Sequence, residues 1–439
     1  MKINRFDMKL YLLVFLIPLI IFSGCAGLPV TTPLGTSAPG LTDTPPVNPA
    51  ITTLPAIQTP AGPVALRLWL PLEFDPSAEN AAAKLLQTQL KEFQTRRSIH
   101  LEVRIKDLEG GRQEVGGGMI NALTTASSAA PLAMPDLVLL PRPALETAAL
   151  KGLLYSFDDF TKLMEDPDWF EYARQLALIQ ESTYGIPFAG DALVMLYRPG
   201  IINQPPENWG AVLSAQSTLL FPAGDPQALF TLAEYEASGG VIQDNAGRPM
   251  LDQNILTNVL IFFQQAQVAG KMPYWLSQFE NDQQAWQAYK DNRASIVISW
   301  SSRYLKELPI DTMATLLPTP DGKDFTLATG WVWALTSINL ERRALSAELA
   351  EFLVASDFSA TWSEASGYLP PRPSALQKWH NIPSMTLVNE IETSAHLIPP
   401  SDVLVMVGQV LEEATIKVLK QESDAVTAAQ EAIKKIETQ

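Results

Sequence analysis

The stretch VALRLWLPLEFDPSAENAAAKLLQTQLKEFQTRRSIHLEVRI, residues 64–105, contains the pattern that decides the fold. Residues 64–72 form an almost continuous apolar run, which is typical of a buried strand. Residues 78–96 carry apolar side chains at helical spacing, and residues 99–105 alternate between apolar and polar side chains. The pattern therefore predicts a strand, a helix and a second strand.

The same order continues along the chain. We expect a helix over residues 112–129 and a short apolar strand, DLVLL, over residues 136–140. Strands that alternate with helices predict a parallel sheet in an α/β lobe. Ligands of such sheets bind beyond the carboxyl ends of the strands. The loops PLEFDP and PRPA, which follow Leu70 and Leu140, are therefore the first places where we expect ligand contacts.

Composition narrows the class of protein. The part of the chain that follows residue 63 has about 375 residues, which is too long for one ordinary core and indicates two lobes. Hydrophobic residues make up 47% of the chain and charged residues 18%, as in soluble globular proteins. A formal net charge of -16 argues against nucleic acid or anionic lipid as a partner, because both would need a basic face.

The N-terminus has the layout of a signal peptide. Three basic residues among the first nine precede the apolar run LYLLVFLIPLIIF, residues 10–22. That run of about 13 residues is shorter than the roughly 20 that a membrane-spanning helix needs, and Pro18 interrupts it. We therefore expect residues 1–24 to be a cleaved signal peptide.

The only cysteine of the chain, Cys25, follows that segment directly. Phe22-Ser23-Gly24-Cys25 resembles the lipobox of bacterial lipoproteins, although Phe22 stands where Leu or Val is usual. The resemblance implies that Cys25 is lipidated and anchors the protein to the outer face of the cytoplasmic membrane. The alternative is an ordinary secreted protein whose cysteine is incidental.

Residues 26–63 are rich in Thr, Pro, Ala and Gly, and Asp43 is their only charged residue. Such a segment cannot bury enough apolar surface to fold, and its prolines favour extended conformations. We expect residues 25–63 to form a lipidated, disordered linker.

Six segments of the folded part, taken in order, resemble family 1 of the extracellular solute-binding proteins of ABC importers. They are PDLVLLPRPALETAALKGLLYSFDDF (135–160), YGIPFAGDALVMLYRPGI (184–201), PPENWGAVL (205–213), DNRASIVISWSSRYL (291–305), LLPTPDG with TLATGWVWALT (316–336), and AELAEFLVASDFSATWSEASGYLPPRPSAL (347–376). Taken in the family's order, the six segments extend the resemblance over nearly all of the chain after residue 63. One departure is Asn208, which stands where the family usually has Thr.

The resemblance implies an α/β, two-lobed periplasmic-binding-protein fold whose chain crosses three times between the lobes. A ligand that touches both lobes of such a fold favours the closed form. The loaded protein would then deliver its solute to a membrane permease, and we expect it to act as a monomer. The expected crossings lie near 188–192, 312–320 and 358–366, and the expected lobes are 64–188 with about 313–358, and 191–312 with about 360–439.

The resemblance also indicates a carbohydrate ligand. Sugar rings stack on aromatic faces, and their hydroxyls need charged or amide partners. Trp300 matches a position where sugar-binding members carry a stacking Trp, and Asp191 matches a carboxylate that accepts ligand hydroxyls. Tyr368 lies next to the third crossing, and Trp331 and Trp333 lie close to the second. We expect these five residues to contact a mono- or oligosaccharide.

Three of these residues also have a structural interpretation. Alternation places Trp331 and Trp333 on one face of a strand, where both can belong to the core. Asp191 can cap a helix or pair with Arg198, rather than bind a ligand. 

The loops after the first and third strands add three further candidates, Glu73, Asp75 and Arg142. Arg142 can meet a hydroxyl or carboxylate of the ligand, or it can be a solvated surface charge.

Other functions receive less support from the sequence. A lipid-anchored glycosidase would need two carboxylates that face each other across a cleft, and nothing in the sequence places such a pair. The histidines His100, His380 and His396 have no metal-ligand spacing, and no nucleophile elbow or phosphate loop is present. We therefore expect no enzyme activity, no cofactor and no metal. A non-sugar solute, such as a polyamine or a peptide, and an adhesive or scaffold lipoprotein remain as alternatives.

Overall fold

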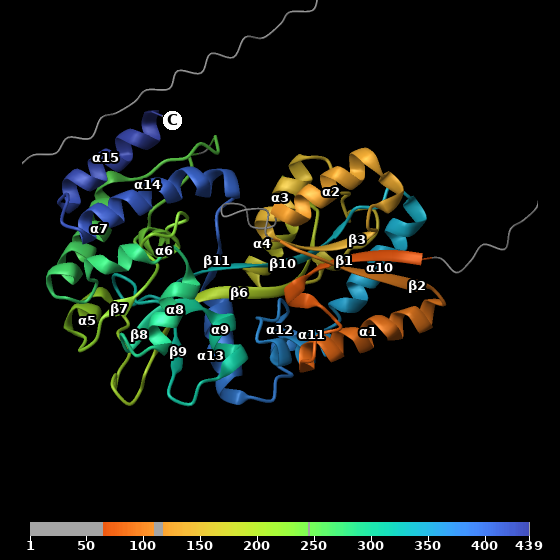
Figure 1. Cartoon of the computed structure of the whole chain (residues 1–439), viewed down its shortest axis with the longest axis horizontal. Coiled ribbons are helices and arrows are strands. Elements are labelled where there is room, and N and C mark those ends of the chain that lie inside the picture. The colour runs from red at the N-terminus through yellow and green to blue at the C-terminus, as the bar shows by residue number, and fades with distance from the viewer. Residues whose placement is uncertain (1–64, 109–116, 245, 439) are drawn as a thin grey trace, which may run out of the picture. The chain divides into compact units, whose positions relative to one another are not determined.

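The computed structural model describes residues 65–108, 117–244 and 246–438 (Figure 1). The expected signal peptide, Cys25 and the linker lie outside the described residues. No helix within the described ranges is long and apolar enough to cross a membrane.

The elements alternate between strands and helices along most of the chain. The strands are β1 (Ala65–Pro71), β2 (His100–Lys106), β3 (Leu137–Pro141), β4 (Leu178–Ile179), β5 (Ser182–Thr183), β6 (Ile186–Tyr197), β7 (Leu219–Leu220), β8 (Ile296–Trp300), β9 (Met313–Thr315), β10 (Thr326–Leu335) and β11 (Ala395–Leu397). The helices are α1 (Ala81–Arg97), α2 (Gly117–Ala129), α3 (Arg142–Leu150), α4 (Glu171–Ala177), α5 (Trp209–Ser214), α6 (Leu229–Ala237), α7 (Gln253–Val268), α8 (Asp282–Lys290), α9 (Ser301–Glu307), α10 (Leu340–Leu353), α11 (Ser356–Ser366), α12 (Pro373–Leu376), α13 (Ile382–Ser394), α14 (Ser401–Leu419) and α15 (Ala425–Thr438).

The first strands and helix lie where the sequence predicts them. Strand β1 pairs in parallel with both β2 and β3, as the strand-helix alternation indicated. Helix α1 begins after Asn80, whose side chain accepts a hydrogen bond from the backbone N–H of Ala83. This cap fixes the turn between β1 and α1, and it therefore fixes the loop that contains Glu73 and Asp75.

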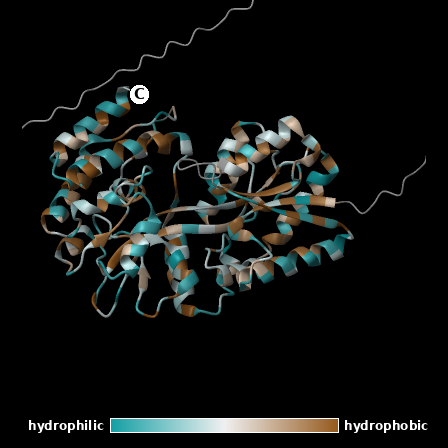
Figure 2. Cartoon of the chain, viewed as in Figure 1, coloured by the Kyte–Doolittle hydropathy of each residue, from teal (hydrophilic) through white to brown (hydrophobic). Residues whose placement is uncertain are grey.

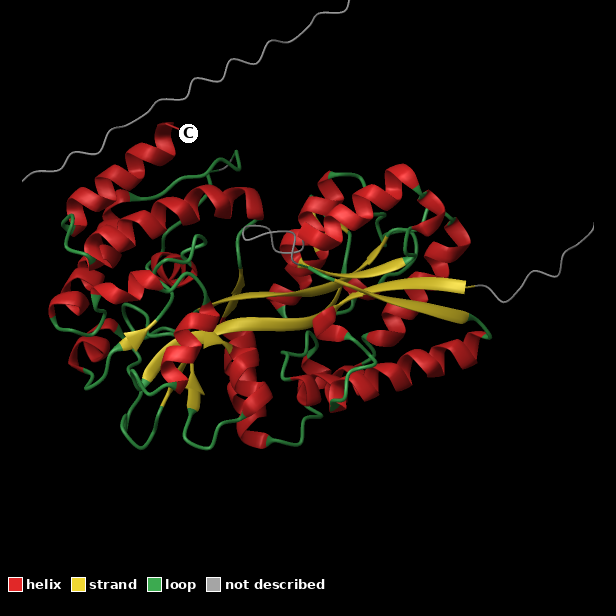
Figure 3. Ribbon diagram, viewed as in Figure 1, coloured by secondary structure: helices red, strands yellow, loops and turns green. Residues whose placement is uncertain are grey.

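Two long strands connect the two halves of the described chain. The sheet has the order β2-β1-β3-β10-β6-β8-β7, with β11 paired to β10 and β9 paired to β6. The second half of β10 pairs with β3, while its first three residues pair with β11. Strand β6 likewise pairs with β10 over its first part and with β8 and β9 over its last part. Figure 3 shows these two strands running from one group of helices to the other.

The structure therefore has two lobes joined along β6 and β10. The first lobe contains β1 to β3 with α1, α2, α3, α10 and α11, and the second contains β7 to β9 with α5 to α9, α14 and α15. The expected first crossing, near residues 188–192, falls within β6. Near residues 312–320, β9 pairs with the second-lobe part of β6, so the next connecting strand is β10, over residues 326–335.

The expected third crossing, residues 358–366, corresponds to helix α11, which packs against α1 in the first lobe. Just after it, Leu369 exchanges backbone hydrogen bonds with Gly190 of β6. The chain thus returns to the connecting strands immediately beyond α11. The limits of the two lobes stay a prediction.

Apolar side chains cover both faces of the sheet. One core cluster joins β1, β3 and Trp333 of β10 with α1, α10 and α11. A second cluster lies on the other face of the first lobe and continues through the second lobe. Figure 2 shows the hydrophobic colour concentrated along the strands and the inner parts of the helices. Packing on both faces leaves the carboxyl end of β1 as a place where polar loops can meet a ligand.

Candidate functional site

A pocket of about 290 Å³ opens at the carboxyl end of β1. Most of its lining comes from the first lobe, and Lys306 comes from α9 of the second lobe. The lining residues come from the loop after β1, the start of α1, the end of α11 and α9; they are Glu73, Phe74, Asp75, Asn80, Ala82, Ala83, Leu86, Lys306, Trp362, Ala365, Ser366 and Tyr368.

Three aromatic rings form one wall of this pocket. Phe74 lies nearly parallel to Tyr368, with ring centroids 5.5 Å apart, and nearly parallel to Trp362 at 5.8 Å. Trp362 and Tyr368 are themselves parallel within 4° at 6.2 Å. Trp331 meets Phe74 edge-on, with centroids 4.8 Å apart. These rings are held in the core of the first lobe, so they form a rigid apolar wall.

The polar groups of the pocket keep unused hydrogen-bonding capacity. Within the described residues, Glu73 makes no hydrogen bond or ion pair with another side chain. One carboxylate oxygen of Asp75 accepts from the backbone N–H and the hydroxyl of Ser77, at 2.8 and 2.7 Å, and its other oxygen has no hydrogen-bond partner among the described residues. Asn80 uses its amide oxygen to cap α1, which leaves its amide N–H groups as donors.

Lys306 supplies the only ammonium among the lining residues. Its Nζ atom lies 4.0 Å from the centre of the Tyr368 ring. Although Lys306 as a residue is exposed, desolvation of its ammonium lowers its pKa, and the nearby charges of Asp191 and Glu73 oppose this effect. Burial also raises the pKa of Tyr368 well above its usual value. The raised pKa keeps the Tyr368 hydroxyl protonated at neutral pH.

Asp191 lies at the start of α9 and holds that helix against β6. Its carboxylate accepts hydrogen bonds from the Ser301 hydroxyl at 2.8 Å, from the Ser302 backbone N–H at 3.0 Å and from the Ser302 hydroxyl at 2.6 Å. Desolvation raises the pKa of Asp191, and these hydrogen bonds oppose the shift. The structure thus places Asp191 in the helix-capping role, and Arg198 pairs instead with Asp311.

Arg142 lies outside the pocket, in a network that joins the two lobes. Its Nε donates to Glu146 at 2.7 Å, and its Nη1 donates to three carbonyl oxygens at the end of α4. The other oxygen of Glu146 accepts from the backbone N–H and the hydroxyl of Ser401, the first residue of α14. A cation at a helix C-terminus and an anion at a helix N-terminus both match the helix dipoles. We call this network the Arg142–Glu146–Ser401 link.

The three predicted tryptophans lie in different environments. Trp333 is 0% exposed and packs against Phe188 in the core of the first lobe. Trp331 is half-buried beside Phe74, next to the pocket wall. Trp300 is half-buried at the end of β8 and packs against the larger core cluster.

The structure therefore brings together Glu73, Asp75 and Tyr368, with Trp331 next to them. Sequence reasoning did not identify Asn80, Lys306 or Trp362. The helix-start signal of Asn80 was visible in the sequence, but the approach of α9 to Tyr368 depends on the folding of distant segments. Among the described residues, no group of His, Cys, Asp and Glu could hold a metal ion.

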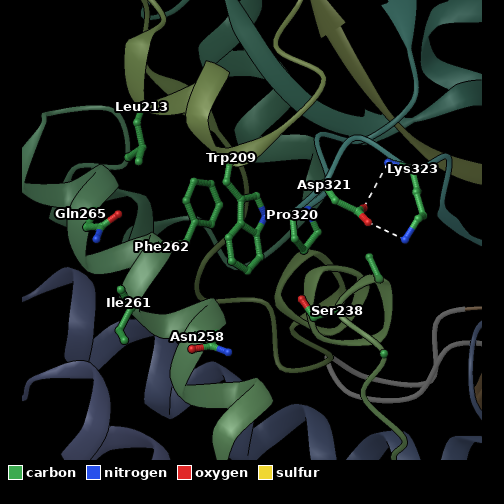
Figure 4. Close-up of a pocket in the computed structure, with 12 residues that line it drawn as sticks. Trp209, Leu213, Ser238, Asn258, Ile261, Phe262, Gln265, Pro320, Asp321 and Lys323 are labelled. Atoms are coloured by element: carbon green, nitrogen blue, oxygen red, sulfur yellow. Dashed lines mark hydrogen bonds and ion pairs between the residues drawn. The ribbon is translucent and has the colours of Figure 1, made fainter.

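A larger cavity of about 620 Å³ lies within the second lobe, between α5, α7 and the loop at residues 320–323 (Figure 4). There Trp209 stacks on Phe262, with centroids 4.7 Å apart and planes within 1°. Figure 4 shows Trp209 between Phe262 and Pro320, and its indole N–H donates to Glu234. All of its lining residues belong to one lobe and its neighbouring loop, so closure of the lobes would not enclose a ligand there. We therefore place the candidate site at the smaller pocket.

A two-lobed fold with a polar, aromatic-walled pocket that receives residues from both lobes defines a solute-binding protein. A sequence model of the family described as bacterial extracellular solute-binding protein matches residues 112–386, which is more than half of the chain. The chain belongs to this family. It is accordingly a binding protein and not an enzyme.

Solved structures confirm the predicted fold. The cyclic alpha-maltosyl-1,6-maltose binding protein of Arthrobacter globiformis is similar over 86% of this chain and 99% of its own, with a TM-score of 0.70 and 14% identity. A cyclo/maltodextrin-binding protein complexed with maltotetraose is similar over 87% and 98%, with a TM-score of 0.70 and 18% identity. The maltose-binding protein MalE of Listeria monocytogenes is similar over 85% and 97%, with a TM-score of 0.68 and 15% identity. No curated protein sequence matches the chain.

Proposed function

We propose that this protein is the lipid-anchored receptor of an ABC importer, which binds a carbohydrate between its lobes and delivers it to a membrane permease. The observation that carries the carbohydrate assignment is the lining of the 290 Å³ pocket, where an aromatic wall stands beside free hydrogen-bond donors and acceptors. We assign ligand contacts to Glu73, Asp75 and Tyr368 of the predicted residues, and the contacts of Arg142, Asp191, Trp300, Trp331 and Trp333 stay predictions.

The chemistry of sugars matches this lining. A sugar ring has an apolar face that packs on aromatic rings, and every hydroxyl both donates and accepts hydrogen bonds. Glu73 and the free oxygen of Asp75 can accept from hydroxyls, while Lys306 and the amide of Asn80 can donate to them. The bonds of the two carboxylates and the ammonium involve ionised groups, so they are stronger than bonds between neutral groups. Three of the similar structures belong to proteins that are named for maltose or maltodextrin ligands or were solved with them, which supports the same class of solute.

Binding of a panel of solutes to the purified full chain in mild detergent tests this proposal. We expect at least one sugar to bind with a dissociation constant on the order of micromolar, or about -8 kcal/mol. Amino acids, polyamines and peptides should not bind. Stabilisation by one of these solutes alone would reject the carbohydrate assignment and leave the solute-binding class intact.

Two variants test whether the sugar binds in this pocket. Tyr368→Ala removes one ring of the wall and should lower sugar affinity at least tenfold. Tyr274→Ala is the matched control, because Tyr274 is 59% exposed and does not line the pocket. Equal sugar affinity of the two variants would place the site elsewhere.

The membrane anchor is tested separately, because Cys25 lies outside the described residues. The Cys25→Ser variant should no longer incorporate labelled fatty acid, and it should leave the membrane fraction under conditions that retain the native protein. A variant that stays bound to the membrane as firmly as the native chain would show that the lipid anchor is not at Cys25.

A further inference from the structure

The volume of the pocket matches the size of one sugar ring. A cavity of about 150 Å³ accommodates benzene, which has six non-hydrogen atoms. At the same density, the 290 Å³ pocket accommodates about twelve non-hydrogen atoms, the number in one hexose. A chain of several linked glucose units is several times larger. The pocket therefore suits one sugar ring, although similar structures contain longer sugars, such as maltotetraose.

The charges of the pocket also limit the class of solute. Two carboxylates, Glu73 and Asp75, face the pocket, so a sugar acid would bring a third negative charge to them. An amino sugar would instead place a second cation beside the ammonium of Lys306, and this repulsion opposes its attraction to Glu73 and Asp75. A neutral ring introduces neither repulsion. It can use the carboxylates as acceptors and the ammonium as a donor.

Lys306 has a position that no other lining residue shares, since it belongs to the second lobe. Helix α9 packs against β6, β8 and β9 of that lobe. Asp191 of the connecting strand β6 holds the first turn of α9, and Lys306 lies at the other end of the same helix. A ligand bound to the first-lobe wall therefore reaches the second lobe through Lys306.

The backbone beside Tyr368 supports this close approach. Gly367 has a φ of 73°, in the left-handed region that favours glycine. A Cβ atom added to Gly367 would lie 2.7 Å from the backbone nitrogen of Lys306. The end of α9 can thus lie directly against Gly367 only because this residue has no side chain. The fold therefore holds the backbone of Lys306 close to Tyr368, within reach of the lysine side chain.

We propose that the pocket takes a single neutral sugar ring and that Lys306 is its specificity-determining residue from the second lobe. This proposal rests on the proposed carbohydrate function. Lys306 donates to ring hydroxyls that the first-lobe carboxylates also bind, so the ligand bridges the two lobes. A ligand that makes this bridge favours the closed form over the open one.

Calorimetric titration of the full chain in mild detergent tests the size and charge of the ligand. The probes are neutral hexoses and pentoses, maltose, maltotriose, glucuronate and glucosamine. We expect the best neutral monosaccharide to bind at least tenfold more tightly than maltotriose, glucuronate and glucosamine. Tighter binding of maltotriose, or of either charged sugar, would overturn the proposal while the carbohydrate function stood. Binding of non-sugar solutes alone would overturn both.

A pair of lysine variants tests the role of Lys306. Lys306→Gln should weaken binding of the best monosaccharide at least tenfold. Lys290→Gln is the control, because the Lys290 ammonium also lies over an aromatic ring of the second lobe, that of Trp286, but outside the pocket. It should bind the sugar as the native chain does.

Thermal unfolding without ligand separates this role from a structural one. The melting temperatures of the two variants should agree within about 2 °C, since each loses one exposed cation–π contact. Unchanged affinity in Lys306→Gln, or equal losses in both variants, would overturn the role of Lys306.

Discussion

The buried carboxyl of Glu234 should make the stability of this protein depend on pH. Glu234 lies on α6 and is 1% exposed. One of its oxygens accepts the indole N–H of Trp209, and the other has no hydrogen-bond partner among the described residues. Burial raises its pKa from 4.5 to about 8, and the hydrogen bond from Trp209 opposes the shift only in part.

The direction of the effect follows from proton binding. Between the unfolded-state pKa of 4.5 and the folded-state pKa of about 8, the folded protein keeps a proton that the unfolded chain releases. The free energy of unfolding therefore falls as the pH rises through this window. With these two values, the linkage relation gives a loss on the order of 4 kcal/mol between about pH 5 and about pH 9.

The Glu234→Gln variant isolates this contribution. Glutamine stays neutral at every pH and keeps a carbonyl oxygen that can accept from Trp209. Urea unfolding at a series of pH values should show a decline that is smaller by roughly 4 kcal/mol in this variant than in the native chain. Glu437→Gln, at an exposed position near the C-terminus, should follow the native chain. An equally steep decline in Glu234→Gln and the native chain would refute the reasoning.

Two further substitutions test contacts that join distant parts of the chain. Glu146→Ala leaves the Arg142 guanidinium without its carboxylate and removes the acceptor for Ser401, so we expect a loss of about 3 kcal/mol, or about 4 °C in melting temperature. A change below about 1 °C would show that the Arg142–Glu146–Ser401 link contributes little. Gly367→Ala should cost about 2 kcal/mol, from its left-handed backbone and the collision with Lys306, and should also weaken sugar binding. Gly200→Ala, which meets no atom within 4 Å, is its control, and equal stability of the two would contradict the account.

The predicted residues that line the pocket on the loop after β1 are those whose position depends on local pattern. Glu73 and Asp75 follow a strand whose apolar run was evident, and the rule for the carboxyl ends of parallel strands placed them at a pocket. The same rule suggested Arg142, which follows β3. Its guanidinium turns to Glu146, one helical turn away, and to the carbonyl oxygens at the end of α4. Nothing in the sequence shows that the end of α4 lies there.

The role of Lys306 in the pocket could not be predicted from the sequence. Its segment reads as the exposed end of a short amphipathic helix, and its partner Tyr368 lies more than 60 residues further along the chain. The second connecting strand shows the same limit, since the sequence favoured a crossing near residues 312–320, where β9 lies, over β10. Only β10 is long enough to pair with β3 in one lobe and with β11 in the other. The partners with which a strand pairs decide whether it crosses between the lobes, and these partners lie far away in the sequence.

The contacts that join the lobes suggest how binding and closure are coupled. The Arg142–Glu146–Ser401 link connects α3 to α14 without any residue of the pocket, so a solute in the pocket does not compete for its hydrogen bonds. The contact between Lys306 and Tyr368 lies inside the pocket, where a solute can exchange it for hydrogen bonds of its own. A solute can shift a conformational equilibrium only by its difference in affinity for the two forms. Lys306 is therefore the place where solute identity can affect closure.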